Sequence, residues 1–428
     1  MKTLAGKKRH GVVQSPQFEQ RCRQAQCRSC GQKGLDGILD LGAMPLADGL
    51  LTAEQLHQNE PRYPLELAFC PACTLVQIVE TVPPQVLFSA DYPYYSSFSA
   101  ALLEHSRDNA LNLIAQRRLN AHSLVVEIAS NDGYLLKNFV ENHIPVLGID
   151  PAEGPVRAAR EIGVTTLQEF FGLELAQRLV AEGKQADVII ANNVLAHVAD
   201  TNGIVGGIAK LLKSDGVAVI EVPYLRELID HCEFDTIYHE HLCYFSVTAV
   251  ERLARRHGLY LNRIQQLPIH GGSLRLFLEL KDNRRNSVTE MLETEKRLGM
   301  DRIDYYRSFA RQAAALQHRL RRLLARLQGQ GCSIAAYGAA AKGAVMLNSV
   351  QAGPDTIRFV VDRNVHKQGK YMPGVHIPID APQRILQDKP DYVLVLPWNF
   401  KDEILSQCQD YRDQGGRFII PVPRPVVV

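Results

Sequence analysis

Residues 125–135 have the sequence VVEIASNDGYL, which combines a short apolar strand with a tight turn. The run Val125–Ile128 is typical of a buried strand, and Gly133 can adopt the positive φ that a sharp turn before a helix requires. Backbone amides in such a turn approach a bound ligand closely. The stretch therefore predicts the first strand and turn of a nucleotide-binding α/β unit.

The sequence around this turn points away from a dinucleotide. The turn carries one glycine, whereas the dinucleotide fingerprint carries three, so a bound pyrophosphate is disfavoured here. The next apolar run, Val146–Ile149, ends at Asp150, where an acid can accept hydrogen bonds from ribose hydroxyls. Further strand-like runs lie at 186–191 and 217–222, separated by segments of helical length. This alternation predicts a parallel, doubly wound sheet.

Together these residues resemble the core of the class I S-adenosylmethionine-dependent methyltransferases. The resemblance implies that the cofactor is held by Glu127, Asn131, Asp132, Gly133, Leu135, Asp150, Asn192 and Asn193. A Rossmann-like unit that binds another nucleotide is the alternative.

A second α/β series begins near residue 333, with apolar runs at 333–337, 357–361, 392–396 and 418–421. It predicts a second Rossmann-like unit at the C-terminus. An NAD-binding domain is the alternative, which the absence of a GxGxxG motif disfavours.

Two CxxC pairs, Cys27/Cys30 and Cys70/Cys73, lie in the N-terminal region. Each two-residue gap can form a knuckle that points two thiolates at one ion, and four thiolates complete a tetrahedral zinc site. Four thiolates leave no open position for a substrate, so we expect a structural Zn²⁺. Redox-active or unligated thiols are the alternatives.

These patterns divide the chain into four parts. We expect a basic flexible tail at 1–20, a zinc-binding domain at 21–85, a methyltransferase domain at 86–290 and a C-terminal Rossmann-like domain at 291–428. The last of these includes a long charged helix at 301–328, whose arginines we assign to a solvated face.

The composition of the 428 residues is 46% hydrophobic and 22% charged, with a formal net charge of +2. This near-neutral charge disfavours nucleic acid as a partner. No run approaches the roughly 20 apolar residues of a membrane span, and no signal-type segment follows the basic start. We therefore expect a cytoplasmic protein with no membrane contact. The odd count of nine cysteines favours reduced thiols.

The segment Tyr238-His239-Glu240-His241 follows the predicted strand at 217–222, at the sheet edge where open α/β folds bind ligands. A histidine there can take a proton from a carbon beside a carbonyl, and a neighbouring Glu or Tyr can orient it. Metal binding by the histidines and a purely structural use of all these side chains are the alternatives. His197 follows another strand end and can face the same cleft.

The ordered motifs also include Tyr92-Pro93-Tyr94 and Tyr337-Gly338-Ala339-Ala340-Ala341-Lys342-Gly343. In this order they resemble the nucleotide-sugar C-methyltransferases, three-domain enzymes that methylate C3 of nucleoside-diphosphate 4-keto-deoxysugars. The resemblance covers the chain from about residue 25 onward.

The resemblance implies S-adenosylmethionine and structural Zn²⁺ as cofactors and a nucleoside-diphosphate sugar as substrate. It implies that His241 abstracts the C3 proton, assisted by Glu240, Tyr238 and His197, and that Tyr92 or Tyr94 stabilises the enolate or exchanges protons.

The C-terminal domain is expected to hold the sugar nucleotide. Gly338 permits a strand-to-helix turn whose amides can meet a diphosphate, and Lys342 adds positive charge. The substrate-binding candidates are Tyr337, Gly338, Lys342, Gly343, Asn364, Lys367, Gln368 and His270. Methyl transfer to oxygen, nitrogen or another small molecule, and an RNA- or partner-binding methyltransferase docked by the zinc module, are the alternative functions.

Overall fold

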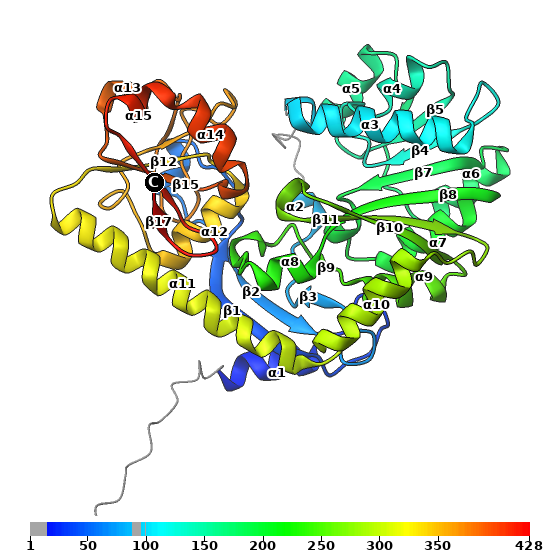
Figure 1. Ribbon diagram of the computed structural model, residues 1–428, viewed down its shortest axis with the longest axis horizontal. Helices are drawn as coiled ribbons and strands as arrows, with labels where there is room; N and C mark the ends of the chain where they lie inside the picture. The colour runs from blue at the N-terminus through cyan, green and yellow to red at the C-terminus, as the bar shows by residue number, and fades with distance from the viewer. Residues whose placement is uncertain (1–14, 88–95, 99) are drawn as a thin grey trace, which may run out of the picture.

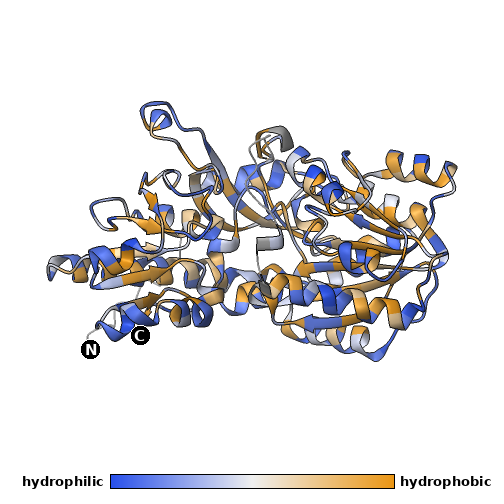
Figure 2. Ribbon diagram, turned by 90° about the horizontal axis from the view of Figure 1, so that it is seen from above, coloured by the Kyte–Doolittle hydropathy of each residue, from blue (hydrophilic) through white to orange (hydrophobic). Residues whose placement is uncertain are grey.

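The computed structural model describes residues 15–87, 96–98 and 100–428. The predicted α/β class is confirmed: the chain forms a small cysteine-containing module and two larger α/β units (Figure 1). The C-terminal unit and the methyltransferase-like unit form two lobes, and the cysteine-containing module joins them from below (Figure 1). Apolar residues concentrate on the inner strands, while the outward helix faces are hydrophilic (Figure 2).

The N-terminal module is built on a four-stranded antiparallel sheet of order β1-β2-β3-β9. Its elements are α1 (Pro16–Gln24), β1 (Asp36–Pro45), η1 (Glu54–His57), β2 (Arg62–Phe69), β3 (Val76–Ile78) and α2 (Pro84–Leu87). The fourth strand, β9 (Cys243–Tyr244), comes from far along the chain and pairs with β3. The segment that contains the predicted catalytic histidine therefore enters the sheet of this module.

Helix α1 begins inside the segment 1–20, which the sequence predicts as a flexible tail. The Ser15 hydroxyl caps the helix by accepting a hydrogen bond from the Phe18 amide at 3.1 Å. The Phe18 ring is fully buried against Gly37, where a Cβ atom would lie 2.5 Å from the ring. The described residues 16–20 are thus part of the folded module.

The middle unit carries a seven-stranded sheet of order β10-β11-β8-β7-β4-β5-β6. Its strands are β4 (Val125–Ile128), β5 (Val146–Ile149), β6 (Thr166–Leu167), β7 (Ala186–Asn192), β8 (Leu212–Pro223), β10 (Tyr260–Leu267) and β11 (Ser273–Glu279). Its helices are η2 (Ser96–Phe98), α3 (Ala100–Arg117), α4 (Lys137–Val140), α5 (Glu153–Glu161), α6 (Leu173–Ala181), η3 (Leu195–His197), α7 (Thr201–Leu211), α8 (Leu225–Asp230), η4 (Phe234–Thr236), α9 (Val247–Arg256) and η5 (Ile269–Gly271).

The prediction of a parallel sheet is correct for strands β4 to β8 and wrong for the edge formed by β10 and β11. Strands β10 and β11 form an antiparallel hairpin, and β11 also pairs antiparallel with β8. The reason is the short connection at 268–272, which reverses the chain directly instead of crossing over through a helix.

Helices α10 (Asn286–Leu298) and α11 (Ile303–Gly329) lead to the C-terminal unit, and α11 packs on both β1 and α12. This unit has a six-stranded sheet of order β14-β13-β12-β15-β16-β17, parallel except for the last strand. Its elements are β12 (Ile334–Tyr337), α12 (Ala341–Val350), β13 (Val360–Val361), β14 (Ile379–Asp380), α13 (Arg384–Asp388), β15 (Tyr392–Val395), η6 (Trp398–Phe400), α14 (Lys401–Gln407), α15 (Gln409–Asp413), β16 (Arg417–Ile420) and β17 (Val426–Val427).

The strand predicted at 357–361 is shorter than expected, because a turn in which the Ile357 amide donates to the Gly353 carbonyl occupies its first residues. Over the described part of the chain, no helix is both long and apolar enough to cross a membrane.

Candidate active site

The four cysteines of the two CxxC pairs converge in the N-terminal module. Their Sγ atoms all lie within 4.8 Å of one another, with Cys27 to Cys73 at 3.4 Å and Cys30 to Cys70 at 3.5 Å. A tetrahedral site with Zn–S lengths of about 2.3 Å needs sulfur atoms roughly 3.8 Å apart, so the four thiols fit a zinc ion. Four thiolates would fill the tetrahedron and leave no open position for a substrate, which suits a structural role.

The two knuckles have matching backbone geometry. In each, the residue four places after the first cysteine returns its amide to that cysteine's carbonyl: Gly31 to Cys27 at 2.9 Å and Thr74 to Cys70 at 2.8 Å. Both residues have positive φ, 74° for Gly31 and 65° for Thr74. The equal geometry turns both pairs of thiols toward one point.

The turn after β4 is shaped by left-handed residues and by an acid at the end of β5. Ala129, Asn131 and Gly133 have φ values of 53°, 49° and 77°. The Asn131 amide donates to Asp150 Oδ2 at 2.9 Å, while Asp150 Oδ1 accepts from the Ala152 amide at 2.9 Å. Asp150 therefore fixes the turn, and each of its oxygens keeps a second lone pair for a ligand.

Three acids gather beneath this turn. Glu127, Asp132 and Asp150 are each at most 5% exposed. Burial, with smaller contributions from the Asp150 and Asp132 charges, raises the pKa of Glu127 well above its ordinary value. Burial also raises the pKa of Asp150.

Several buried oxygens at this edge lack a partner among the described residues: Glu127 Oε2, Asp132 Oδ1 and Asn192 Oδ1. Unpaired buried acceptors are costly, so they indicate a ligand that brings N–H or O–H donors and positive charge. S-adenosylmethionine has ribose hydroxyls, an ammonium group and a sulfonium centre, so the residues present fit this cofactor.

The remaining cofactor candidates are placed differently. Asn193 follows β7 with a φ of 56° and donates its amide to the Glu221 carbonyl at 2.8 Å, which sets the turn at the carboxyl edge of the sheet. The Leu135 side chain is fully buried in an apolar cluster with Val125 and Phe139. This location assigns the Leu135 side chain to packing.

Hydrogen bonds to Thr236 and Tyr238 help to orient His241. Its Nδ1 lies 3.1 Å from the Thr236 carbonyl oxygen, and its Nε2 lies 2.9 Å from the Tyr238 hydroxyl. A carbonyl only accepts, so Nδ1 carries the hydrogen and the lone pair of the neutral ring resides on Nε2. The Tyr238 hydroxyl then donates to Nε2. With this tautomer, Nε2 is the ring atom that can accept a proton.

The His197 ring lies beside His241, with ring centroids 4.7 Å apart in an edge-to-face arrangement. Burial lowers the pKa of His197 to about 4, so this ring is neutral near pH 7. His239 points elsewhere: it is fully buried, with Nε2 3.2 Å from the Pro64 carbonyl and its ring against Tyr63. His239 thus joins the segment to the N-terminal module.

Glu240 lies in a buried junction of all three parts of the chain. Burial, with a smaller contribution from the Asp48 carboxylate, raises the pKa of Glu240 to about 8. Burial likewise raises the pKa of Asp48, and the positive charge of Lys367 opposes that shift. Asp48 belongs to the N-terminal module and Lys367 to the C-terminal unit. Glu240 is therefore protonated near neutral pH and can donate a hydrogen bond.

A second buried cluster holds the turn that orients His241. Asp235 is fully buried in η4, and its Oδ2 accepts from Trp398 Nε1 at 2.8 Å. Lys342 donates to Asn399 Oδ1 at 2.8 Å and lies 4.5 Å from the Trp398 ring centroid. Burial raises the pKa of Asp235 to about 6, against the opposing positive charge of Lys342. The C-terminal unit thus binds Asp235, the residue before Thr236, through Trp398.

The turn after β12 repeats the frame of the turn after β4. The Ala339 amide donates to Asp362 Oδ2 at 2.7 Å, and the Asn364 amide donates to Asp362 Oδ1 at 2.8 Å. Gly338 has a φ of 90°, and a Cβ there would lie 2.4 Å from Pro397. Lys367 donates to the Ala339 carbonyl at 2.7 Å, so a second cation adjoins this turn.

Other predicted substrate residues support this frame. Gln368 donates to the Asp362 carbonyl at 2.9 Å, Tyr337 is 6% exposed, and Gly343 packs directly against Leu396. Tyr92 and Tyr94 lie outside the described residues, and so does the side chain of His270.

Sequence patterns did not reveal Asp48, Glu233, Asp235 or Trp398 as site residues. Burial raises the pKa of Glu233 to about 8, and Lys342 opposes this shift. The local sequence signal is a pair of acids two residues apart, Glu233 and Asp235, a few residues before the Tyr-His-Glu-His segment.

Three family models match the chain in order. They are a "zinc binding domain" at residues 27–88, a "Methyltransferase domain" at 102–263 and a "C-methyltransferase C-terminal domain" at 268–423. The C-methyltransferase NovU of Streptomyces niveus is 34% identical over 406 residues, which are 94% of this chain and 96% of that protein.

Two further likenesses are shorter or more distant. A ubiquinone biosynthesis O-methyltransferase of Bartonella quintana is 28% identical over 97 residues, 22% of this chain and 39% of that protein. The structure of magnesium protoporphyrin IX methyltransferase from Synechocystis with bound SAM matches at a TM-score of 0.32 and 15% identity. That match covers 41% of this chain and 79% of that one.

Proposed function

The chain belongs to the C-methyltransferase family with a zinc-binding domain, and from this premise we propose that its acceptor is C3 of a nucleoside-diphosphate 4-keto-deoxysugar. It is an S-adenosylmethionine-dependent C-methyltransferase, and the proposal concerns its substrate and its catalytic base. The observation that carries the proposal is the 3.1 Å contact between His241 Nδ1 and the Thr236 carbonyl, because it leaves Nε2 as the basic atom.

Bound S-adenosylmethionine supplies an electrophilic methyl group, and the acids Glu127, Asp132 and Asp150 and the turn after β4 would hold it. The ketone at C4 acidifies the hydrogen on C3, and His241 Nε2 takes this proton to give an enolate. The resulting imidazolium donates through Nδ1 to the Thr236 carbonyl, which stabilises the charge. The C–H electron pair is left on C3 as the enolate. This carbon would form the new C–C bond with the methyl group as the bond from that group to sulfur breaks, and the thioether S-adenosylhomocysteine would leave.

Two groups beside His241 can act on the enolate oxygen. Glu240 is protonated near neutral pH, since burial raises its pKa to about 8, and a neutral carboxyl can donate a hydrogen bond to an enolate. Tyr238 donates to Nε2 in the resting geometry and must release it before the base acts. The neutral His197 ring packs against His241 without adding a competing positive charge.

The C-terminal unit would hold the diphosphate of the substrate. Its turn offers amides at the start of α12 and the cations Lys342 and Lys367, which suit an anion. Because Trp398 of the same unit bonds Asp235 in η4, the unit that binds the nucleotide also supports the turn that orients His241.

The test is methyl transfer from labelled S-adenosylmethionine to a panel of sugar nucleotides, with and without the 4-keto group, followed by mass spectrometry of the products. We expect methylation on carbon and only of 4-keto-deoxysugar nucleotides. Methylation of oxygen or nitrogen, or of sugars that lack the ketone, would contradict the proposal.

A further inference from the structure

A polar groove crosses the open face of the β10–β11 hairpin, beside α3. We name it the arginine groove, after Arg117, Arg263, Arg275 and Arg285. One part of it is a cavity of about 350 Å³, and an adjoining part measures about 90 Å³. The cavity begins at Val217, in the first half of β8. This cavity therefore lies along β8 before the carboxyl edge that carries the turn after β7.

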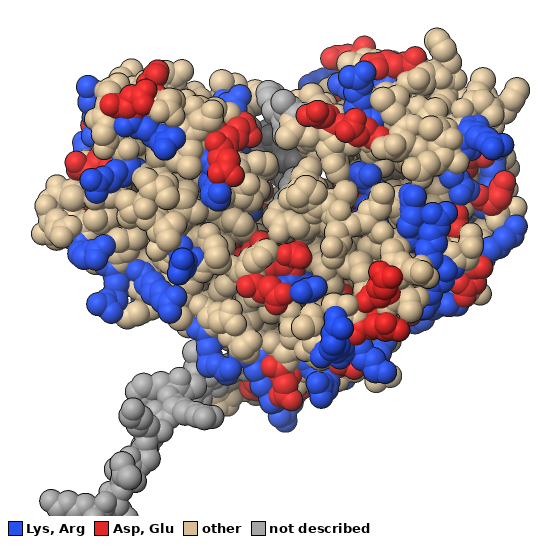
Figure 3. Space-filling view, viewed as in Figure 1, with Lys and Arg blue, Asp and Glu red and all other residues tan. Residues whose placement is uncertain are grey.

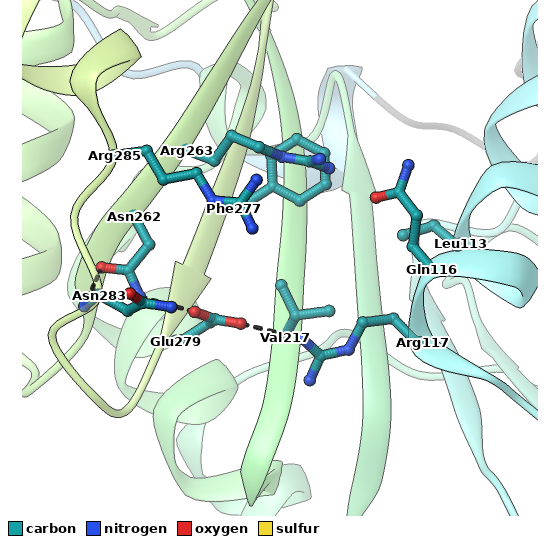
Figure 4. Close-up of a pocket in the computed structure, with 10 residues that line it drawn as sticks. All are labelled: Leu113, Gln116, Arg117, Val217, Asn262, Arg263, Phe277, Glu279, Asn283 and Arg285. Atoms are coloured by element: carbon teal, nitrogen blue, oxygen red, sulfur yellow. Dashed lines mark hydrogen bonds and ion pairs between the residues drawn. The ribbon is translucent and has the colours of Figure 1, made fainter.

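The alternation of the hairpin places polar residues on the groove side. Arg263 lies opposite Phe277, and Gln265 lies opposite Arg275, so two cross-strand pairs form the floor. The intervening Leu276 is fully buried on the other face. Helix α3 forms the wall. Figure 4 shows Arg263 lying over the Phe277 ring, and the guanidinium carbon is 3.6 Å from the ring centroid.

The positive charges in the groove exceed the available carboxylates. Glu279 is already engaged, by Arg117 at 3.0 Å and by Asn262 at 2.6 Å (Figure 4). The guanidinium groups of Arg263 and Arg285 make no hydrogen bond or ion pair with any described residue. These two guanidinium groups can therefore bond an anionic ligand.

The second part of the groove contains an unsatisfied donor of another kind. Asn109 on α3 is 2% exposed, and its Nδ2 has no acceptor among the described residues. Arg275, 7% exposed, lines the same part and bonds Glu221 at 2.7 Å. Burying an amide donor without an acceptor costs free energy. The unpaired Asn109 Nδ2 therefore indicates that a ligand in the groove supplies the acceptor.

We propose that the arginine groove is a binding site for a phosphate-bearing small molecule, distinct from the methyl-donor and sugar-nucleotide sites. Arg263 and Arg285 would contact the phosphate oxygens as paired guanidinium donors, and Asn109 would contribute an amide donor further along. The cavity volume lies at the lower end of small-ligand sites, which favours a diphosphate-sized ligand over a macromolecule.

The experiment is titration calorimetry of the full-length protein with inorganic pyrophosphate, together with hydrogen–deuterium exchange of the protein with and without pyrophosphate. We expect pyrophosphate to slow exchange at 109–117 and 260–279. The double variant R263Q/R285Q should lose this protection and bind at this site at least about tenfold more weakly, because charge-assisted hydrogen bonds are lost. The variant R311Q, which removes one exposed arginine from α11, should behave as the wild type.

Two results would overturn the proposal. One is protection confined to the turn after β12, because pyrophosphate would then bind only at the proposed sugar-nucleotide site. The other is an R263Q/R285Q protein that folds with an unchanged Tm and keeps the full protection at 260–279. The R263K variant checks the assignment, since it keeps the charge and should retain more affinity than R263Q.

Discussion

The first turns of the two α/β units share a backbone frame and differ in charge. After β4 the Asn131 amide bonds Asp150, and after β12 the Ala339 amide bonds Asp362, both through Oδ2. In each turn, Oδ1 of the same acid accepts a hydrogen bond from the amide of the residue two positions later. These donors are Ala152 at 2.9 Å and Asn364 at 2.8 Å. One frame of strand, turn and strand-end acid has thus been used twice.

The difference lies in what surrounds the frame. Glu127 and Asp132 leave unpaired acceptors beneath the first turn, which suits a cationic ligand rich in donors. Lys342 and Lys367 adjoin the second turn, which suits an anion. The two turns thus share a backbone frame and differ in the charges around it, which would favour different ligands.

The largest effect is expected from breaking the module that joins the two units. Cys73→Ser or exhaustive chelation should lower the Tm by more than about 10 °C, because a structural zinc site contributes folding free energy directly. Loss of the module also removes the partner of β9 near His241. Calorimetry with zinc analysis checks this, and Cys408→Ser, outside the cluster, serves as control. An unchanged Tm in zinc-free protein would contradict a structural ion.

Equivalent substitutions in the two turns test whether each turn binds a different ligand. Asp150→Ala should weaken S-adenosylmethionine binding by about 100-fold, because it removes the acceptor that shapes the turn and its ligand contacts. Asp362→Ala should weaken nucleoside-diphosphate binding by a similar factor. Titration calorimetry of each variant with both ligands checks the pattern. If either substitution weakened both ligands equally, the two turns would not select different ligands.

A smaller effect on kcat tests whether the C-terminal unit helps to orient His241. Asp235→Ala removes the acceptor of Trp398 Nε1 and should lower kcat about tenfold with KM little changed, because η4 then holds the Thr236 carbonyl less firmly. Asp235→Asn keeps a carbonyl acceptor and should restore most of the rate. Steady-state kinetics of both variants check this prediction. Equal losses of kcat in the two variants would contradict a positioning role for Asp235.

The smallest effect concerns the junction at Glu240. Because the folded-state pKa is raised from 4.5 to about 8, the protonated carboxyl is favoured in the folded state. Its contribution to stability is therefore present below about pH 4.5 and is lost as the pH rises toward 8. Glu240→Gln should remove this slope, so its Tm relative to wild type should rise between pH 5 and pH 8. Thermal melts across that range check the sign, and a falling difference would contradict it.

Much of the fold could be predicted from local sequence. Neighbouring residues encode the strands at 146–149 and 392–396 and the two CxxC knuckles. The hairpin β10–β11 does not follow from the alternation of strands and helices before it, because its short connection reverses the chain without a crossover helix.

The site was less predictable where distant segments meet. Asp48, Asp235 and Trp398 lie in three different parts of the chain, and only tertiary packing gives them a role beside the Tyr-His-Glu-His segment. His239 shows the reverse: its motif position suggests chemistry, but its contact with the Pro64 carbonyl makes it a structural residue.

The most direct measurement is the exchange of the C3 hydrogen of a 4-keto-deoxysugar nucleotide with D₂O, followed by NMR in the absence of the methyl donor. The wild type should exchange this hydrogen, and His241→Asn should exchange it at least about 100-fold more slowly while still binding S-adenosylmethionine. Exchange at the wild-type rate in the His241→Asn protein would contradict the assignment of Nε2 as the base.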